Sequence, residues 1–108
     1  MEYISRYNLK PLKGTEFRQW LLENEPLIAE NTPEGWTYLG TWFTVLGFGK
    51  YQCETRYEID DYGALGVVFG NETFQRLLLE WMEFMDLTQA GETYLMKSAT
   101  DVSVLPGT

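Results

Sequence analysis

Polar and apolar residues alternate at the start of the chain. This pattern predicts a β-strand over residues 2–9, with Tyr3, Ser5, Tyr7 and Leu9 on one face. Pro11 ends the strand because it cannot donate to a strand ladder. A helix is then expected from about Thr15, a candidate N-cap. Pro26 predicts a kink or a second short helix. The residues that recur at helical spacing and should face the core are Phe17, Trp20, Leu21 and Ile28.

The rest of the chain reads as three more strands and a second helix. Strands are expected over residues 36–46, 51–59 and 93–100, with a hairpin connection at 47–50 and a helix at 72–87 capped by Asn71. One or two helical turns are expected between Tyr62 and Gly70. The order β-α-β-β-α-β predicts an α+β, ferredoxin-like fold, in which a four-stranded antiparallel sheet carries two helices on one face. We expect a single domain over residues 1–100 and a loose tail over 101–108.

The faces of the predicted strands bear on the oligomeric state. Residues 51–59 place Cys53, Thr55 and Tyr57 on an apolar face and charged residues on the other. In residues 36–46, strict alternation puts Trp36, Tyr38 and Trp42 on one face and Leu39, Phe43 and Val45 on the other. A strand that is apolar on both faces needs cover on both. Two helices cover only one face of the sheet, so the sequence predicts a homodimer.

Composition and charge exclude several classes of partner. The 108 residues carry a net charge of −8, which disfavours nucleic acid and anionic membranes. No apolar run reaches the ~20 residues of a membrane helix. Cys53 is the single cysteine, so no intrachain disulfide can form, and a buried inert thiol is expected there. With no signal peptide recognisable after Met1, we expect a cytoplasmic protein.

The chain contains no histidine. Its absence removes Ser-His-Asp and Cys-His nucleophiles, imidazole metal ligands and His-ligated haem. The pair Asp60-Asp61 is too small for a Ca²⁺ loop and is expected to cap the following turn. The glycines at 63, 66 and 70 do not form a dinucleotide fingerprint. The sequence therefore predicts neither a metal nor a cofactor.

Three segments of the chain resemble a known family. YNLKPLK at residues 7–13, followed by Phe17, is similar to the Y-x-L-K-P-x-K first-strand exit of NIPSNAP-like proteins in the dimeric α+β barrel superfamily. LGTWFT at 39–44, with Gly47, is similar to the L-G-x-W-x-T…G second strand and turn of that family. YEID at 57–60 occupies the place of its W-E-Y-D segment. The resemblance spans residues 3–95. It implies a dimeric α+β barrel with any pocket between sheet and helices, while the lack of histidine separates the chain from haem-degrading members.

Charged and aromatic residues on the central strands are the candidate ligand-binding positions. Arg6, Glu54, Arg56 and Glu58 could form a charged pocket wall or a proton-transfer site, or pair across strands as ions without further role. Trp42, Tyr57 and Tyr94 could line a cavity for a planar aromatic molecule, although strand aromatics most often belong to the core.

Three functions remain open on the sequence alone. The first is a small-molecule-binding or accessory protein, whose partner would be a small hydrophobic or aromatic molecule, because no catalytic signature is present. The second is a cofactor-independent monooxygenase or isomerase acting on a small aromatic or lactone-like metabolite. The third is a purely structural homo-oligomer. A closed cavity of a few hundred Å³ would favour the enzyme. A core filled by Phe17, Trp20, Phe74 and Trp81 would favour the binding protein.

Overall fold

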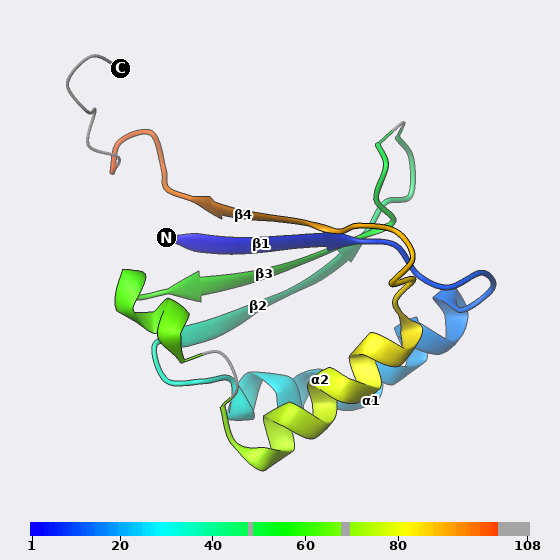
Figure 1. Cartoon of the computed structure of the whole chain (residues 1–108), viewed down its shortest axis with the longest axis horizontal. Helices are drawn as coiled ribbons and strands as arrows, with labels where there is room; N and C mark the ends of the chain where they lie inside the picture. Colours follow the sequence, from blue (N-terminus) through cyan, green and yellow to red (C-terminus); the bar gives the residue numbers. More distant parts are fainter. Residues whose placement is uncertain (48, 68–69, 102–108) are drawn as a thin grey trace.

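The computed structural model describes residues 1–47, 49–67 and 70–101 of the chain. In these residues the β-α-β-β-α-β order is confirmed, with one 3₁₀ helix, η1, between the third strand and the second α-helix (Figure 1). The elements are β1 (Glu2–Tyr7), α1 (Gly14–Asn31), β2 (Trp36–Phe43), β3 (Cys53–Ile59), η1 (Tyr62–Gly66), α2 (Glu72–Phe84) and β4 (Glu92–Met96).

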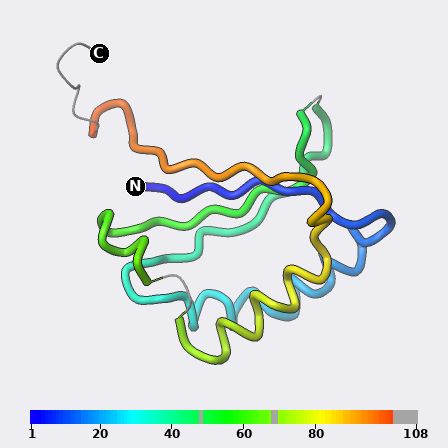
Figure 2. Tube along the Cα trace, in the orientation of Figure 1, coloured from blue at the N-terminus to red at the C-terminus, as the bar shows by residue number. Residues whose placement is uncertain are grey.

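The four strands form one antiparallel sheet in the order β2-β3-β1-β4, with β1 and β3 at its centre (Figure 2). Both helices lie on the same side of this sheet (Figure 1). The predicted ferredoxin-like α+β architecture is therefore confirmed. The sheet has one face toward the helices, here called the helix face, and an opposite face, here called the open face.

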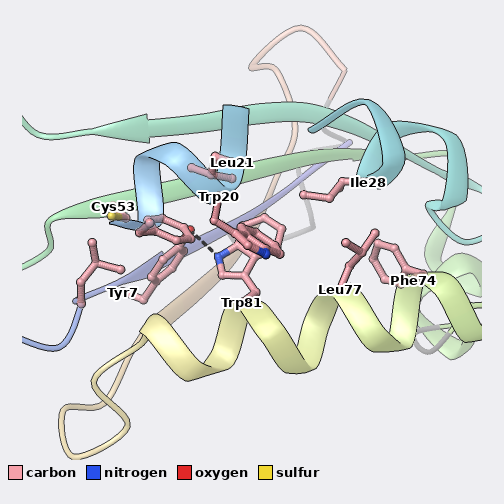
Figure 3. Close-up of a cluster of buried hydrophobic side chains, with 10 residues drawn as sticks. Tyr7, Trp20, Leu21, Ile28, Cys53, Phe74, Leu77 and Trp81 are labelled. Atoms are coloured by element: carbon pink, nitrogen blue, oxygen red, sulfur yellow. Dashed lines mark hydrogen bonds between the residues drawn. The ribbon is translucent and has the colours of Figure 1, made fainter. Parts of the chain in front are cut away.

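The core lies between the helix face and the two helices (Figure 3). Phe17 of α1 is completely buried and packs against Tyr7, Trp20, Phe43 and Trp81. The predicted apolar stripe of α1 is confirmed, since its buried residues are Phe17, Trp20, Leu21 and Ile28. These aromatic side chains fill the space near the start of α1 and the end of α2.

The face assignment predicted for β2 is wrong, because the strand contains a β-bulge. Tyr38 pairs with Tyr57, but Gly40 pairs with the next residue, Arg56, so Leu39 is an extra residue on β2. Gly40 has φ of 137°, which favours glycine over residues with a Cβ. After the bulge every side chain changes face. Phe43 therefore joins the core, and Trp42 lies on the open face.

The two helix starts behave differently. The predicted cap at Asn71 is confirmed, since its Oδ1 accepts a hydrogen bond from the N–H of Phe74 at 2.8 Å. Thr15 is not the cap of α1, because the helix already begins at Gly14 after Lys13. The prediction of a second short helix from Pro26 is also wrong, because α1 continues through this residue. Pro26 has no N–H to donate to the carbonyl one turn earlier in the helix, but it lies on the exposed side of α1, where water can bond that carbonyl instead.

The connection between β2 and β3 is longer than the predicted hairpin at 47–50. The strand pairing ends at Phe43 and Cys53, and Phe48 lies outside the described residues. Asn8 explains the early end. Its amide donates to the carbonyl of Lys50 and accepts from the N–H of Gln52, both at 2.9 Å. The chain before β3 is thus held to the end of β1. The last strand ends at Met96, earlier than predicted, and of the predicted tail only Asp101 is described.

Candidate functional site

A cavity of about 190 Å³ lies between the helix face of the sheet and α2, and it is partly open to solvent. Most of its wall is aromatic or aliphatic, with methionines from α2 and the segment that follows it. The lining residues are Tyr3, Ser5, Tyr7, Pro33, Trp36, Thr55, Tyr57, Phe74, Leu78, Trp81, Met82 and Met85.

Three aromatic rings from three strands form one wall of this cavity. The ring of Tyr3 lies 4.9 Å from that of Trp36, and the ring of Trp36 lies 5.4 Å from that of Tyr57, all in edge-to-face geometry. The indole N–H of Trp36 donates to the carbonyl of Ala64 in η1 at 2.7 Å. This wall is therefore fixed by the 3₁₀ helix as well as by the sheet.

A chain of hydrogen bonds crosses the helix face from the cavity to α1. The Trp81 indole N–H donates to the Tyr7 hydroxyl at 3.1 Å (Figure 3). That hydroxyl lies 2.8 Å from the hydroxyl of Thr55, which lies 2.9 Å from that of Thr41. Thr41 lies 2.8 Å from the hydroxyl of Tyr38, which donates to Glu25 at 2.8 Å. We call Trp81, Tyr7, Thr55, Thr41, Tyr38 and Glu25 the hydroxyl chain.

The hydroxyl chain satisfies polar groups that would otherwise be costly to bury. Tyr7 and Thr55 are almost fully buried, at 4% and 2% exposure. No fully buried side-chain nitrogen or oxygen in the described residues lacks a hydrogen-bond partner. A fully satisfied polar network in a low-dielectric setting holds its members in one arrangement.

The titratable groups near the cavity are held in their neutral forms. Burial raises the pKa of Tyr7, Tyr38 and Tyr57 well above the ordinary value of a tyrosine. Burial also raises the pKa of the Cys53 thiol to about 12, in agreement with a buried inert thiol. At neutral pH these groups can donate or accept hydrogen bonds, but they are not ionised.

The open face carries a different cluster, centred on Glu54 of β3. Its two carboxylate oxygens bind the side chains of Arg6 and Arg56, each at 2.7 Å. Partial burial alone would raise the pKa of Glu54, but the hydrogen bonds from the two arginines outweigh it and lower that pKa. The charges in this cluster are already paired with one another.

Aromatic rings flank the charged cluster on both sides. The guanidinium of Arg6 lies 5.0 Å from the ring centre of Tyr94, and that of Arg56 lies 5.0 Å from the ring centre of Trp42. Trp42 and Tyr94 remain exposed, at 47% and 38%. The result is a row across all four strands that runs from Tyr94 through Arg6, Glu54 and Arg56 to Trp42.

The structure thus divides the six ligand-binding candidates into two groups. It brings Arg6, Trp42, Glu54, Arg56 and Tyr94 together on the open face, while Tyr57 alone lines the cavity. Their role in ligand binding stays a prediction. Sequence reasoning missed the hydroxyl chain, whose threonines and tyrosines read as ordinary strand residues. The one available signal was Thr55 within the apolar face of β3.

A second cavity, of about 410 Å³, lies at the other end of the sheet. Its lining residues are Arg6, Thr44, Gly49, Lys50, Tyr51, Cys53, Glu54 and Glu92. It is larger than the first cavity, but it is more polar, and Thr44, Gly49 and Lys50 are exposed. Water competes well for such a wall, so we take the smaller, apolar cavity as the candidate site.

Residues 1–47, 49–67 and 70–101 contain no group of three or more Cys, Asp or Glu side chains that could hold a metal ion. Asp61 caps η1, as predicted, because its carboxylate accepts from the N–H of Ala64 at 3.2 Å. Neither α-helix in the same ranges has the length and apolar character needed to cross a bilayer.

Comparison with known proteins gives a structural match. No protein-family model matches the chain, and no curated protein matches it. The crystal structure of an uncharacterized NIPSNAP domain protein from Burkholderia xenovorans matches with a TM-score of 0.66. The match covers 94% of this chain and 98% of that one at 14% identity, a level at which the shared fold is the conclusion. The resemblance seen in the strand motifs is confirmed at that level: the chain has a NIPSNAP-like, ferredoxin-like α+β fold.

Proposed function

We propose that the protein binds a small, mostly apolar ring compound in the cavity between the helix face and α2. One observation carries the proposal. An apolar cavity with a few placed hydroxyl groups is the usual form of a small-molecule site. Here Tyr3, Trp36 and Tyr57 supply flat surfaces, and the hydroxyl chain reaches the wall at Tyr7 and Thr55.

The volume limits the size of the ligand. A cavity of about 150 Å³ holds one benzene molecule in a well-studied engineered case. Drug-sized ligands need about 300–1,000 Å³. A cavity of about 190 Å³ therefore suits a single six-membered ring with one or two substituents.

The observations favour a binding protein over an enzyme. Phe17 and Trp20 pack in the core, and the cavity lined by Phe74 and Trp81 is partly open rather than closed. A general acid or base works best with a pKa near the working pH. The buried Tyr7, Tyr38, Tyr57 and Cys53 groups have pKa values raised away from neutrality. A cofactor-independent monooxygenase or isomerase remains the alternative, and turnover of a bound ring compound would establish it.

The binding proposal is tested by calorimetric titration with phenol. We expect saturable binding with a Kd between about 10 μM and 1 mM, equivalent to about −7 to −4 kcal/mol. Ser5→Leu is the control, because Ser5 lines the cavity and a leucine there fills it. We expect this variant to fold, by circular dichroism, and to lose phenol binding. Equal binding by both proteins contradicts the proposed site.

We also propose that the protein forms a homodimer through the open face. Leu39, Trp42, Tyr94 and Met96 are all more than a third exposed there. A second copy would cover these side chains, whose grouped exposure otherwise makes an adhesive surface. The charges of Arg6, Glu54 and Arg56 are paired already, so their burial leaves none of them without a partner.

Sedimentation equilibrium tests the dimer. The expected mass is twice the 12.6 kDa of one chain, and Trp42→Glu should return it to one chain. Leu12→Glu is the control, since Leu12 is 99% exposed in the loop before α1, away from the sheet. A single-chain mass for the unmodified protein at micromolar concentration contradicts the proposal.

A further inference from the structure

The hydrogen bonds of the hydroxyl chain all donate in the same direction, and the two ends of the chain determine that direction. The indole of Trp81 can only donate a hydrogen bond, and the carboxylate of Glu25 can only accept one. Each hydroxyl between them has a single proton. Tyr38 gives its proton to Glu25, so Thr41 must donate to Tyr38, Thr55 to Thr41, and Tyr7 to Thr55.

This direction determines what Tyr7 can offer to a ligand. The Tyr7 oxygen accepts from Trp81, and its proton is committed to Thr55. Its remaining capacity is that of an acceptor. Tyr7, Thr55 and Trp81 all line the cavity, and the Tyr7 oxygen joins the other two by hydrogen bonds, so this acceptor lies beside the cavity. A ligand that meets it must bring its own O–H or N–H proton.

We propose that the cavity selects neutral ring compounds that carry a hydrogen-bond donor, and that Glu25 is the positioning residue for this preference. Glu25 does not line the cavity. It acts by holding the proton of Tyr7 away from the ligand, through three intervening hydroxyl groups. The inference rests on the proposed function and names the ligand class of that site.

Replacement of Glu25 by glutamine removes the fixed direction. A glutamine amide can donate to the Tyr38 oxygen as well as accept from it. The protons of Tyr38, Thr41 and Thr55 can then reverse, which frees the Tyr7 proton to point at a ligand. Glu25→Gln should therefore admit acceptor ligands without changing any residue in the cavity wall.

The other cavity hydroxyls do not depend on Glu25. In the described part of the chain, the hydroxyls of Tyr3, Ser5 and Tyr57 also belong to the cavity lining and make no hydrogen bond, so each can donate to an acceptor ligand that reaches it. For this reason the informative quantity is the change in preference between variants. The absolute preference of the unmodified protein includes the contributions of these three hydroxyls.

The test compares three matched probes: phenol, which can donate; anisole, which can only accept; and toluene, which does neither. We expect the ratio of phenol to anisole affinity to fall about 3- to 10-fold in Glu25→Gln, the range of one hydrogen bond. Toluene affinity should stay constant. Glu23→Gln is the control, because Glu23 is an exposed carboxylate on the same helix that bonds to Gln19 instead. An unchanged ratio in Glu25→Gln overturns the inference while leaving the binding site in place.

A second readout needs no ligand and separates this inference from the proposed function. The Tyr7 hydroxyl proton should be protected from exchange and show a nuclear Overhauser effect to the side chain of Thr55. In Glu25→Gln that effect should weaken, and in Glu23→Gln it should not. A Tyr7 proton directed away from Thr55 in the unmodified protein overturns the inference. Absence of binding by all three probes, with this NMR result intact, overturns the proposed function and the ligand preference that rests on it, while the direction of the hydroxyl chain stands.

Discussion

The two faces of the sheet handle polar groups in opposite ways. On the helix face, uncharged hydroxyl groups form a series of hydrogen bonds between Trp81 and Glu25, in which each hydroxyl donates to the next. On the open face, full charges meet directly, with Glu54 between two arginines. The difference follows from burial. A buried charge is expensive, while a buried hydroxyl costs little when both its donor and its acceptor are used.

The comparison also supports the proposed location of the ligand site. The charges of the open-face cluster are paired with one another. On the helix face, the Tyr7 oxygen can accept a further hydrogen bond beside a mostly apolar space. A hydrogen bond to a ligand meets fewer competing charges there, so our proposal assigns ligand recognition to the helix face and self-association to the open face.

The largest effect is expected from the core of the helix face. Phe17→Ala removes a completely buried ring that packs against five other aromatic rings. It should lower the free energy of unfolding by about 3–5 kcal/mol. Chemical denaturation measures this value. A loss below about 1 kcal/mol would show that the core is not closed around Phe17.

An intermediate effect is expected from the middle of the hydroxyl chain. Thr55→Val keeps the side-chain shape but removes the acceptor of Tyr7 and the donor of Thr41. Leaving buried polar groups without partners costs about 1–3 kcal/mol of unfolding free energy. Thr37→Val is the matched control on the exposed side of β2 and should change stability by less than about 0.5 kcal/mol. Equal effects of the two variants would contradict a cooperative hydroxyl chain.

The smallest effect is expected on the open face. Glu54→Gln removes the charge between Arg6 and Arg56, whose side chains are about two-fifths exposed, so the cost should be at most about 1 kcal/mol. The pKa of Glu54 is lowered in the folded protein. The Glu54 carboxylate therefore stabilises the folded protein above the ordinary glutamate pKa of about 4.3, and this stabilisation is lost as pH falls through the lowered pKa. The difference in unfolding free energy between the unmodified protein and Glu54→Gln should be constant above about pH 5 and shrink below it. A difference that grows in acid would contradict the lowered pKa.

The sequence predicted the elements of the fold well, because periodicity and capping are local. The strand positions of Tyr3, Ser5 and Tyr7 and the cap at Asn71 follow from neighbouring residues alone. The faces of β2 could not be predicted by strict alternation, because the extra residue at Leu39 is defined only by pairing with β3. Gly40 is the one local indication of the bulge in the sequence of β2, because its backbone conformation there favours glycine.

The candidate site could be predicted from the sequence only in small part. The charged strand residues Arg6, Glu54 and Arg56 were predicted as ligand-binding positions, but they pair with one another on the open face. The hydroxyl chain joins residues from α1, β1, β2, β3 and α2, separated by up to 74 positions for Tyr7 and Trp81. Such a network exists only after the helices pack on the sheet.

The central claim, that the ligand site is on the helix face, is tested most directly by the indole N–H signals in an NMR titration with phenol. Trp36 and Trp81 line the cavity, Trp42 lies on the open face, and Trp20 belongs to the filled core. We predict that the signals of Trp36 and Trp81 move together and saturate, while those of Trp42 and Trp20 stay in place. Movement of Trp42 alone, or of none of the four, would contradict a ligand site between the sheet and α2.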